Sequence, residues 1–223
     1  ETLTGPEYAH RAQGEALAAG AHLRTGAMVT RLTPDRRLTA VTRQGLLHCQ
    51  AGAVVLAKNG DGPYITHVTP GRIQDKGIKD ANNMGAAMAW AAYDTISQHF
   101  QDTNRSSSFY DLIVTGDLGK LGMEIVIDLF AADGIELRGN YSDCGVMLFD
   151  LEGQDVHCGA SGCGCAASVL TGYLLNGMRA GKWRNLLFCA TGALHSPTSL
   201  GQGESIPGIC HAVAIASTKG GKP

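Results

Sequence analysis

The sequence has no long apolar run, no excess of positive charge and few aromatic residues, which make up 6% of the chain. Its 30 glycines and its charged residues interrupt every hydrophobic stretch, so none reaches the roughly 18 residues that a membrane-spanning helix needs. Lysine and arginine number 18 against 20 acidic residues, for a formal net charge of -2. Because nucleic acids are bound through clustered cations, we expect no nucleic-acid partner.

The first residues of the sequence also lack the features of a signal peptide. The first residues, ETLTGPE, have neither the positive charges nor the apolar core of a secretory signal. We therefore expect no signal peptide and no transmembrane segment, and we interpret the start of the chain as a cut or a fragment.

Two common signatures of bound cofactors and metals are absent as well. No Gly-x-Gly-x-x-Gly fingerprint follows a predicted strand, and the nearest match, residues 159–165, has the wrong spacing. The cysteines, 7 in number, are scattered, and the close group Cys158, Cys163 and Cys165 lacks the paired Cys-x-x-Cys spacing of a structural zinc site. We expect no cofactor, no metal site and cysteines that stay reduced.

The amino-terminal quarter has the pattern of a helix followed by short strands. A capped, alanine-rich segment over residues 4–19 predicts a helix. Alternating residues and turn signals predict an antiparallel meander with strands at 28–32, 37–42 and 46–49, and the apolar run 53–57 predicts a buried strand. A turn-rich joint at residues 58–63 then separates this part from the remainder.

The remainder alternates strands with helices, which is typical of an α/β protein with a layered sheet. The predicted strands cover residues 64–73, 111–115, 186–190 and 212–216, and the predicted helices cover residues 82–100, 120–132 and 165–180.

Several long segments of this part resemble the stage V sporulation protein AD family, which is thiolase-like. The matching segments, in family order, are residues 62–71, 77–88, 111–120, 154–165, 190–194, 196–199 and 202–207. The resemblance covers about residues 51–223 and implies the carboxyl-terminal half of a thiolase-like fold, a mixed sheet layered with helices. In the complete fold two such halves pack about a pseudo-twofold axis.

Residues 1–57 instead resemble an internal piece of an FAD-dependent oxidoreductase, through segments 3–10, 24–36 and 51–57. Both families can carry a string like residues 51–57, so we interpret the chain as a chimera joined there. The expected parts are a flavoprotein-like fragment over 1–57 and the thiolase-like half over 58–223. Without the dinucleotide fingerprint, the first part is not expected to bind flavin.

The resemblance implies a non-enzymatic sporulation protein that binds dipicolinate, for uptake into the forespore and release at germination. It implies a peripheral place on the cytoplasmic side of the spore inner membrane, with other stage V sporulation A proteins as partners. Because a half-fold exposes the surface that would meet its sister half, we also expect a homo-oligomer. The alternatives are a thiolase-like acyltransferase or condensing enzyme and a fragment of an FAD-dependent oxidoreductase.

The resemblance also gives candidate site residues. Thiolase-like enzymes take their nucleophilic cysteine from the first half, and where a catalytic histidine is expected after strand 111–115 this chain has Gly116 and Asp117. We therefore expect no catalytic residue. The candidate dipicolinate pocket comprises His157, Ser161, Gly162, Cys163 and Asp117.

Each candidate has a simpler interpretation. His157 can be a hydrogen-bonded loop histidine, and Asp117 a plain helix cap. Cys163 and Cys165 can serve only to pack a helix start closely.

Overall fold

The computed structural model describes residues 62–219, apart from residue 138 and residues 160–163, together with the backbone of three strands between residues 28 and 50. These strands are β1 (Met28–Leu32), β2 (Arg37–Thr42) and β3 (Gly45–Gln50), paired antiparallel in the order β1-β2-β3. The predicted meander is therefore confirmed. The helix expected over 4–19 and the strand expected over 53–57 lie outside the described residues.

The larger part is built on a five-stranded mixed sheet with the order β4-β8-β7-β5-β6. Its strands are β4 (Tyr64–Thr69), β5 (Leu112–Thr115), β6 (Tyr141–Asp143), β7 (Asn185–Ala193) and β8 (Gly208–Ala216). β5 runs parallel to both β6 and β7, whereas β8 is antiparallel to β7 and β4. The predicted α/β class, a mixed sheet layered with helices, is confirmed.

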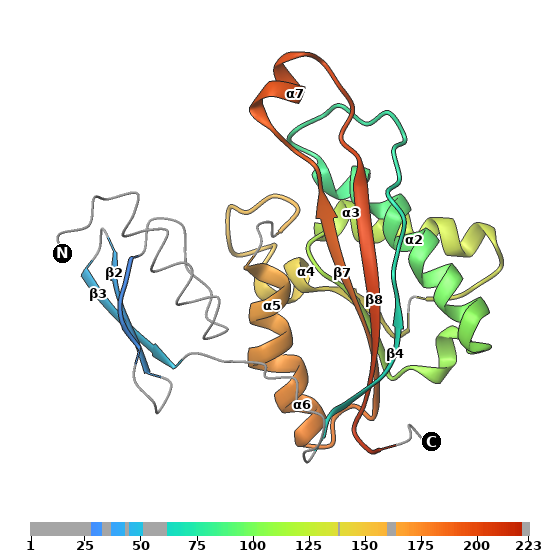
Figure 1. The fold of residues 1–223 in the computed structure, drawn as a ribbon, viewed down its shortest axis with the longest axis horizontal. Coiled ribbons are helices and arrows are strands. Elements are labelled where there is room, and N and C mark those ends of the chain that lie inside the picture. Colours follow the sequence, from blue (N-terminus) through green and yellow to red (C-terminus); the bar gives the residue numbers. More distant parts are fainter. Residues whose placement is uncertain are drawn as a thin grey trace.

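Helices cover both faces of this sheet (Figure 1). α2 (Met84–Thr103) and α3 (Gly119–Ala132) lie on one face, and the short α4 (Cys144–Leu148) lies on the other. On that second face α5 (Cys165–Val169), a π-helical turn η2 (Leu170–Leu174) and α6 (Leu175–Arg179) follow one another without a break. No helix in the described part of the chain combines the length and the hydrophobicity needed to cross a membrane.

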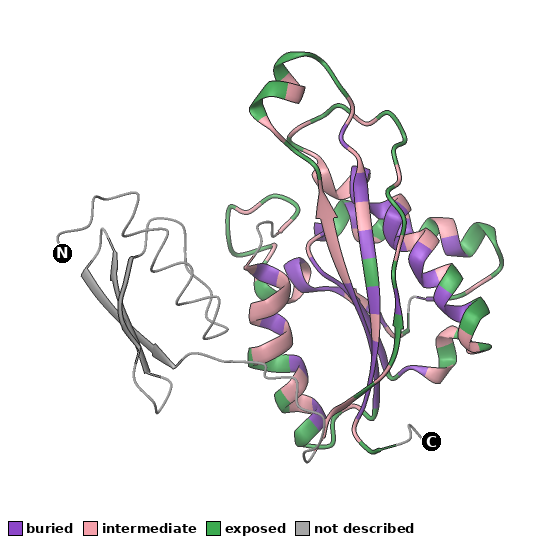
Figure 2. Cartoon of the chain, viewed as in Figure 1, coloured by how far each residue is buried: buried purple, intermediate pink, exposed green. Residues whose placement is uncertain are grey.

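The core forms because side chains alternate along the buried strands. Ile113 of β5 packs in the cluster with α2 and α3, whereas its neighbours Leu112 and Val114 pack in the cluster with α5 and α6. Figure 2 shows the result: buried residues concentrate along the central strands and on the helix sides that face them. A continuous apolar run in the sequence therefore indicates a strand that is covered by helices on both faces of the sheet.

The structure differs from the predicted elements mainly at their ends. The strand expected over 64–73 ends at Thr69, because Pro70 has no N–H to continue the ladder. β7 and β8 are each longer than expected. The strand β6, the helix α4 and the helix α7 (Pro197–Gly201) were not predicted, since each is only three to five residues long.

A fully buried histidine joins α2 to the edge strand β4. The Nδ1 atom of His99 lies 2.7 Å from the hydroxyl oxygen of Thr69, and its Nε2 atom lies 2.5 Å from the hydroxyl oxygen of Tyr110. Burial, together with the charges of Arg105 and His67, lowers the pKa of His99 to about 4. The folded protein therefore holds His99 neutral at pH values where an unfolded chain protonates it.

We expect His99 alone to remove about 2 kcal/mol from the free energy of unfolding between pH 7.5 and pH 5. The pKa of His99 falls from 6.5 to about 4 on folding, so the unfolded state takes up its proton first and stability is lost as the pH falls below 6.5. Urea unfolding of the protein and of His99→Gln, which does not titrate, measures this term. The variant should lose about 2 kcal/mol less over that interval, and equal losses would contradict the assignment.

Candidate functional site

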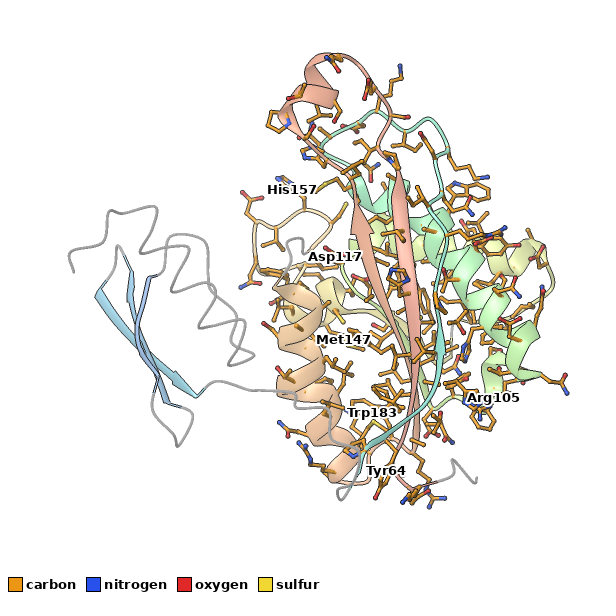
Figure 3. The ribbon with its side chains drawn as sticks, in the orientation of Figure 1. Tyr64, Arg105, Asp117, Met147, His157 and Trp183 are labelled. Atoms are coloured by element: carbon orange, nitrogen blue, oxygen red, sulfur yellow. The ribbon has the colours of Figure 1, made fainter. Side chains whose placement is uncertain are left out.

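The candidate site lies at the carboxyl ends of the parallel strands, the edge where α/β sheets usually place functional groups. Asp117 lies two residues after the end of β5 and is half-buried. Its carboxylate oxygen Oδ1 accepts a hydrogen bond from the Thr191 hydroxyl at 2.7 Å, and its N–H donates to the same hydroxyl oxygen at 3.1 Å. Asp117 is therefore tied to β7, the neighbouring strand of the sheet (Figure 3).

A second acidic residue, Asp143, organises the whole edge. Its carboxylate is fully buried at the end of β6. It accepts hydrogen bonds from the Thr115 hydroxyl at 2.7 Å and from the N–H groups of Leu118, Gly119 and Gly145, each at 2.9 Å. One side chain thus joins the end of β5, the start of α3 and the start of α4.

Asp143 thus supplies hydrogen-bond acceptors to the start of α3 from a position far away in the sequence. The residue that precedes α3, Leu118, has no side-chain acceptor for the first N–H groups, which would otherwise lack partners. Burial raises the pKa of Asp143, although its four hydrogen-bond donors favour the ionised form. Nearby, burial also raises the pKa of Tyr141, whose hydroxyl oxygen lies 3.0 Å from that of Thr115.

The loop that leads to α5 is anchored on the same helix start. The N–H of Lys120 donates to the Cys158 carbonyl oxygen at 2.7 Å. Gly119 has a φ of +65°, and a β-carbon there would lie 2.6 Å from that carbonyl oxygen. His157, the residue before Cys158, is exposed and itself has a φ of 51°. The contact therefore brings His157 to the edge that also carries Asp117.

We expect Gly119→Ala to destabilise the protein by about 3 kcal/mol. A left-handed alanine costs about 1–2 kcal/mol, and displacing Cys158 adds the loss of its hydrogen bond from Lys120, about 1 kcal/mol. Gly134→Ala is a matched control, because Gly134 has a φ of +75° but nothing within 4 Å of its added β-carbon. Urea unfolding should give about 1–2 kcal/mol for the control, the left-handed cost alone, and equal losses in both variants would show that the Cys158 contact contributes nothing.

The structure thus brings two of the five predicted pocket residues, Asp117 and His157, to one edge of the sheet. The other three, Ser161, Gly162 and Cys163, lie outside the described residues. The interpretation of Asp117 as a plain helix cap is wrong, because the carboxylate that accepts the first N–H groups of α3 belongs to Asp143. Sequence reasoning missed Asp143; its only local signal is an aspartate directly before a glycine-containing helix start.

The described cysteines near this edge are mostly protected. Cys144 is fully buried and Cys165 is 5% exposed. Burial, reinforced by the charge of Asp143, raises the pKa of Cys165 to about 12 and that of Cys144 well above its usual range. Cys158 is exposed. Within the described residues, no three His, Cys, Asp or Glu side chains are grouped so that they could hold a metal ion.

Comparison with known proteins identifies the family of the chain. A model of the family described as stage V sporulation protein AD matches residues 40–216, starting within β2. Stage V sporulation protein AD of Bacillus subtilis (strain 168) is 43% identical over 187 residues, which cover 84% of this chain and 53% of the relative. The chain therefore spans about half the length of that relative.

A solved structure, 3-oxoacyl-[acyl-carrier-protein] synthase III from Aquifex aeolicus VF5, is 12% identical to this chain in sequence. The match covers 68% of this chain and 52% of the synthase chain. Its TM-score of 0.31 is too low to support an argument. The family match and the sequence identity do not depend on this likeness, and together they show that the chain belongs to the stage V sporulation protein AD family.

Proposed function

We propose that this chain contributes one wall of a non-enzymatic dipicolinate site, in a protein that serves dipicolinate uptake into the forespore and its release at germination. The observation that carries the proposal is the buried Asp143 network, which fixes the edge bearing Asp117 and His157. The ends of parallel strands are the usual place for a ligand site in an α/β sheet.

Two of the thiols near this edge are unsuited to acyl transfer. Covalent acyl chemistry needs a thiolate nucleophile. Cys144 and Cys165, which flank the Asp143 network, are buried and their raised pKa values hold them protonated at neutral pH.

The charges at this edge suit only weak binding by one half. The first N–H groups of α3 are already taken by Asp143 and Cys158, so they offer nothing to a dianion. Asp117 contributes a carboxylate, which repels one. His157 is the cation-forming candidate, so we propose that the remaining donors come from the other half of the complete protein.

We expect any residual dipicolinate binding to depend on His157 and to be opposed by Asp117. In calorimetric titrations, His157→Ala should abolish the binding and Asp117→Asn should strengthen it several-fold. His67→Ala, an exposed histidine on β4, is the matched control. If His157→Ala binds dipicolinate as tightly as the unsubstituted chain does, His157 is not part of the pocket.

We also propose self-association and docking to other stage V sporulation A proteins, at the cytoplasmic side of the spore inner membrane. Among the described strands, the edge strand β4 pairs with β8 alone. Its side chains Ile65 and Val68 are 46% and 59% exposed. An edge strand with exposed apolar side chains is a surface that proteins usually cover by pairing.

A further inference from the structure

The continuous helix formed by α5, η2 and α6, here called the α5–α6 helix (residues 165–179), has an exposed side without charge. Residues 165–178 include no Asp, Glu, Lys or Arg. Gly172, Tyr173 and Asn176 are nevertheless exposed and form what we call the outer side of this helix. Because a helix at a protein surface normally places charged residues on its exposed side, this pattern is not that of a solvated helix.

The helix α3, on the other face of the sheet, shows the usual pattern. Its exposed side carries Lys120, Glu124 and Asp128, which recur every four residues. A helix that lacks charge all round is typical of one that is covered all round. The outer side of the α5–α6 helix therefore has the composition of a surface that another element covers.

The polar groups on this side already have hydrogen-bond partners within the chain. The Thr171 hydroxyl donates to the Ala167 carbonyl oxygen at 2.8 Å, and the Asn176 amide donates to the Gly172 carbonyl oxygen at 2.9 Å. The Tyr173 hydroxyl oxygen accepts from Lys182 at 2.6 Å. Covering the outer side therefore leaves these groups hydrogen-bonded, which removes the main cost of burying polar atoms.

The same face of the sheet has a strip that the described helices leave open. Ile65 and Val68 of β4 pair with Ile215 and Val213 of β8, whose side chains join the cluster on the second face. Ile65 and Val68 therefore point to that face, yet both are exposed, and among the described side chains none from β4 belongs to the cluster. We call this apolar surface of β4 and the adjoining part of β8 the β4–β8 strip.

The shape of the β4–β8 strip selects a helix as its cover. The α5–α6 helix packs on β5 and β7 (Figure 1), so it rises about 10 Å above the sheet beside the strip. This ridge keeps a flat partner, such as a second sheet, away from the strip. Two strands about 4.8 Å apart present a width of about 10 Å, which matches the diameter of one helix.

We infer that two copies of this chain associate about a twofold axis, with the outer side of the α5–α6 helix of each copy lying on the β4–β8 strip of the other. Each copy supplies an uncharged helix and an open strip one helix wide, so one symmetric contact covers all four surfaces. The inference rests on the self-association proposed above and names its surfaces.

The test is sedimentation equilibrium of the full chain at micromolar concentrations, with Val68→Glu on the strip and Gly172→Glu on the helix. Val68 is exposed, and a β-carbon at Gly172 would meet nothing within 4 Å, so both variants can fold as monomers. Gly201→Glu is the matched control for Gly172→Glu, because Gly201 also lies in a helix, α7, with open space at its β-carbon. Leu121→Glu, at an exposed apolar residue of α3, is the control for Val68→Glu.

We expect a dimer whose dissociation constant rises at least about tenfold in Val68→Glu and in Gly172→Glu, because each buries an unpaired charge. The two controls should change it less than about twofold. A dimer weakened by Val68→Glu but not by Gly172→Glu would show pairing through the β4 edge and overturn the inference, while leaving self-association intact. A chain that stays monomeric would overturn both, and calorimetry with dipicolinate judges the ligand proposal independently.

Discussion

Replacing Asp143 by alanine is expected to lower the free energy of unfolding by about 4 kcal/mol. Alanine removes the cost of burying a charge, but it leaves three buried backbone N–H groups without their acceptor. An unsatisfied buried donor costs about 1–3 kcal/mol, and breaking a buried charged network typically costs about 3–5 kcal/mol.

Asp150→Ala is the matched control for this prediction. Asp150 is exposed and accepts the N–H groups of Glu152 and Gly153 at 3.2 and 3.1 Å. Solvent replaces it as their partner, so the control should lose less than about 1 kcal/mol. Denaturant unfolding measures both variants, and Asp143→Asn should fall between them because one amide oxygen still accepts. A loss under 1 kcal/mol in Asp143→Ala would mean that Asp143 does not organise the edge.

The parts of the fold that could be predicted are those written in local patterns. The alternation over β1 to β3 and the long apolar stripes of α2 and α3 follow from periodicity and turn residues. β6 could not be predicted in this way, because its three residues carry no period and exist as a strand only through pairing with β5. The end of β4 depends on one residue, Pro70, whose effect the longer predicted strand overlooked.

The candidate site divides along the same line. Asp117 became a candidate because it follows a predicted strand at the functional edge of an α/β sheet, and His157 became one through the family resemblance. Asp143 is 24 residues beyond the helix start that it caps, and only the folded structure brings the two together. A buried acceptor that serves several elements leaves no local pattern, so tertiary contacts are needed to find it.

A second large effect concerns the affinity of the chain for dipicolinate. We expect this chain to bind at least a hundredfold more weakly than a complete relative. Micromolar binding requires about 8 kcal/mol, whereas a partly buried anion at a helix start gains only about 2 kcal/mol. Here the first N–H groups of α3 are already taken by Asp143 and Cys158, so we expect the other half of a complete relative to supply most of the free energy.

The direct measurement is a calorimetric titration of dipicolinate into this chain and, in parallel, into full-length stage V sporulation protein AD of Bacillus subtilis. The account predicts saturable binding by the relative and binding at least a hundredfold weaker by this chain. Equal micromolar affinities would contradict the claim that the site needs both halves, and no binding by the relative would contradict dipicolinate as the ligand.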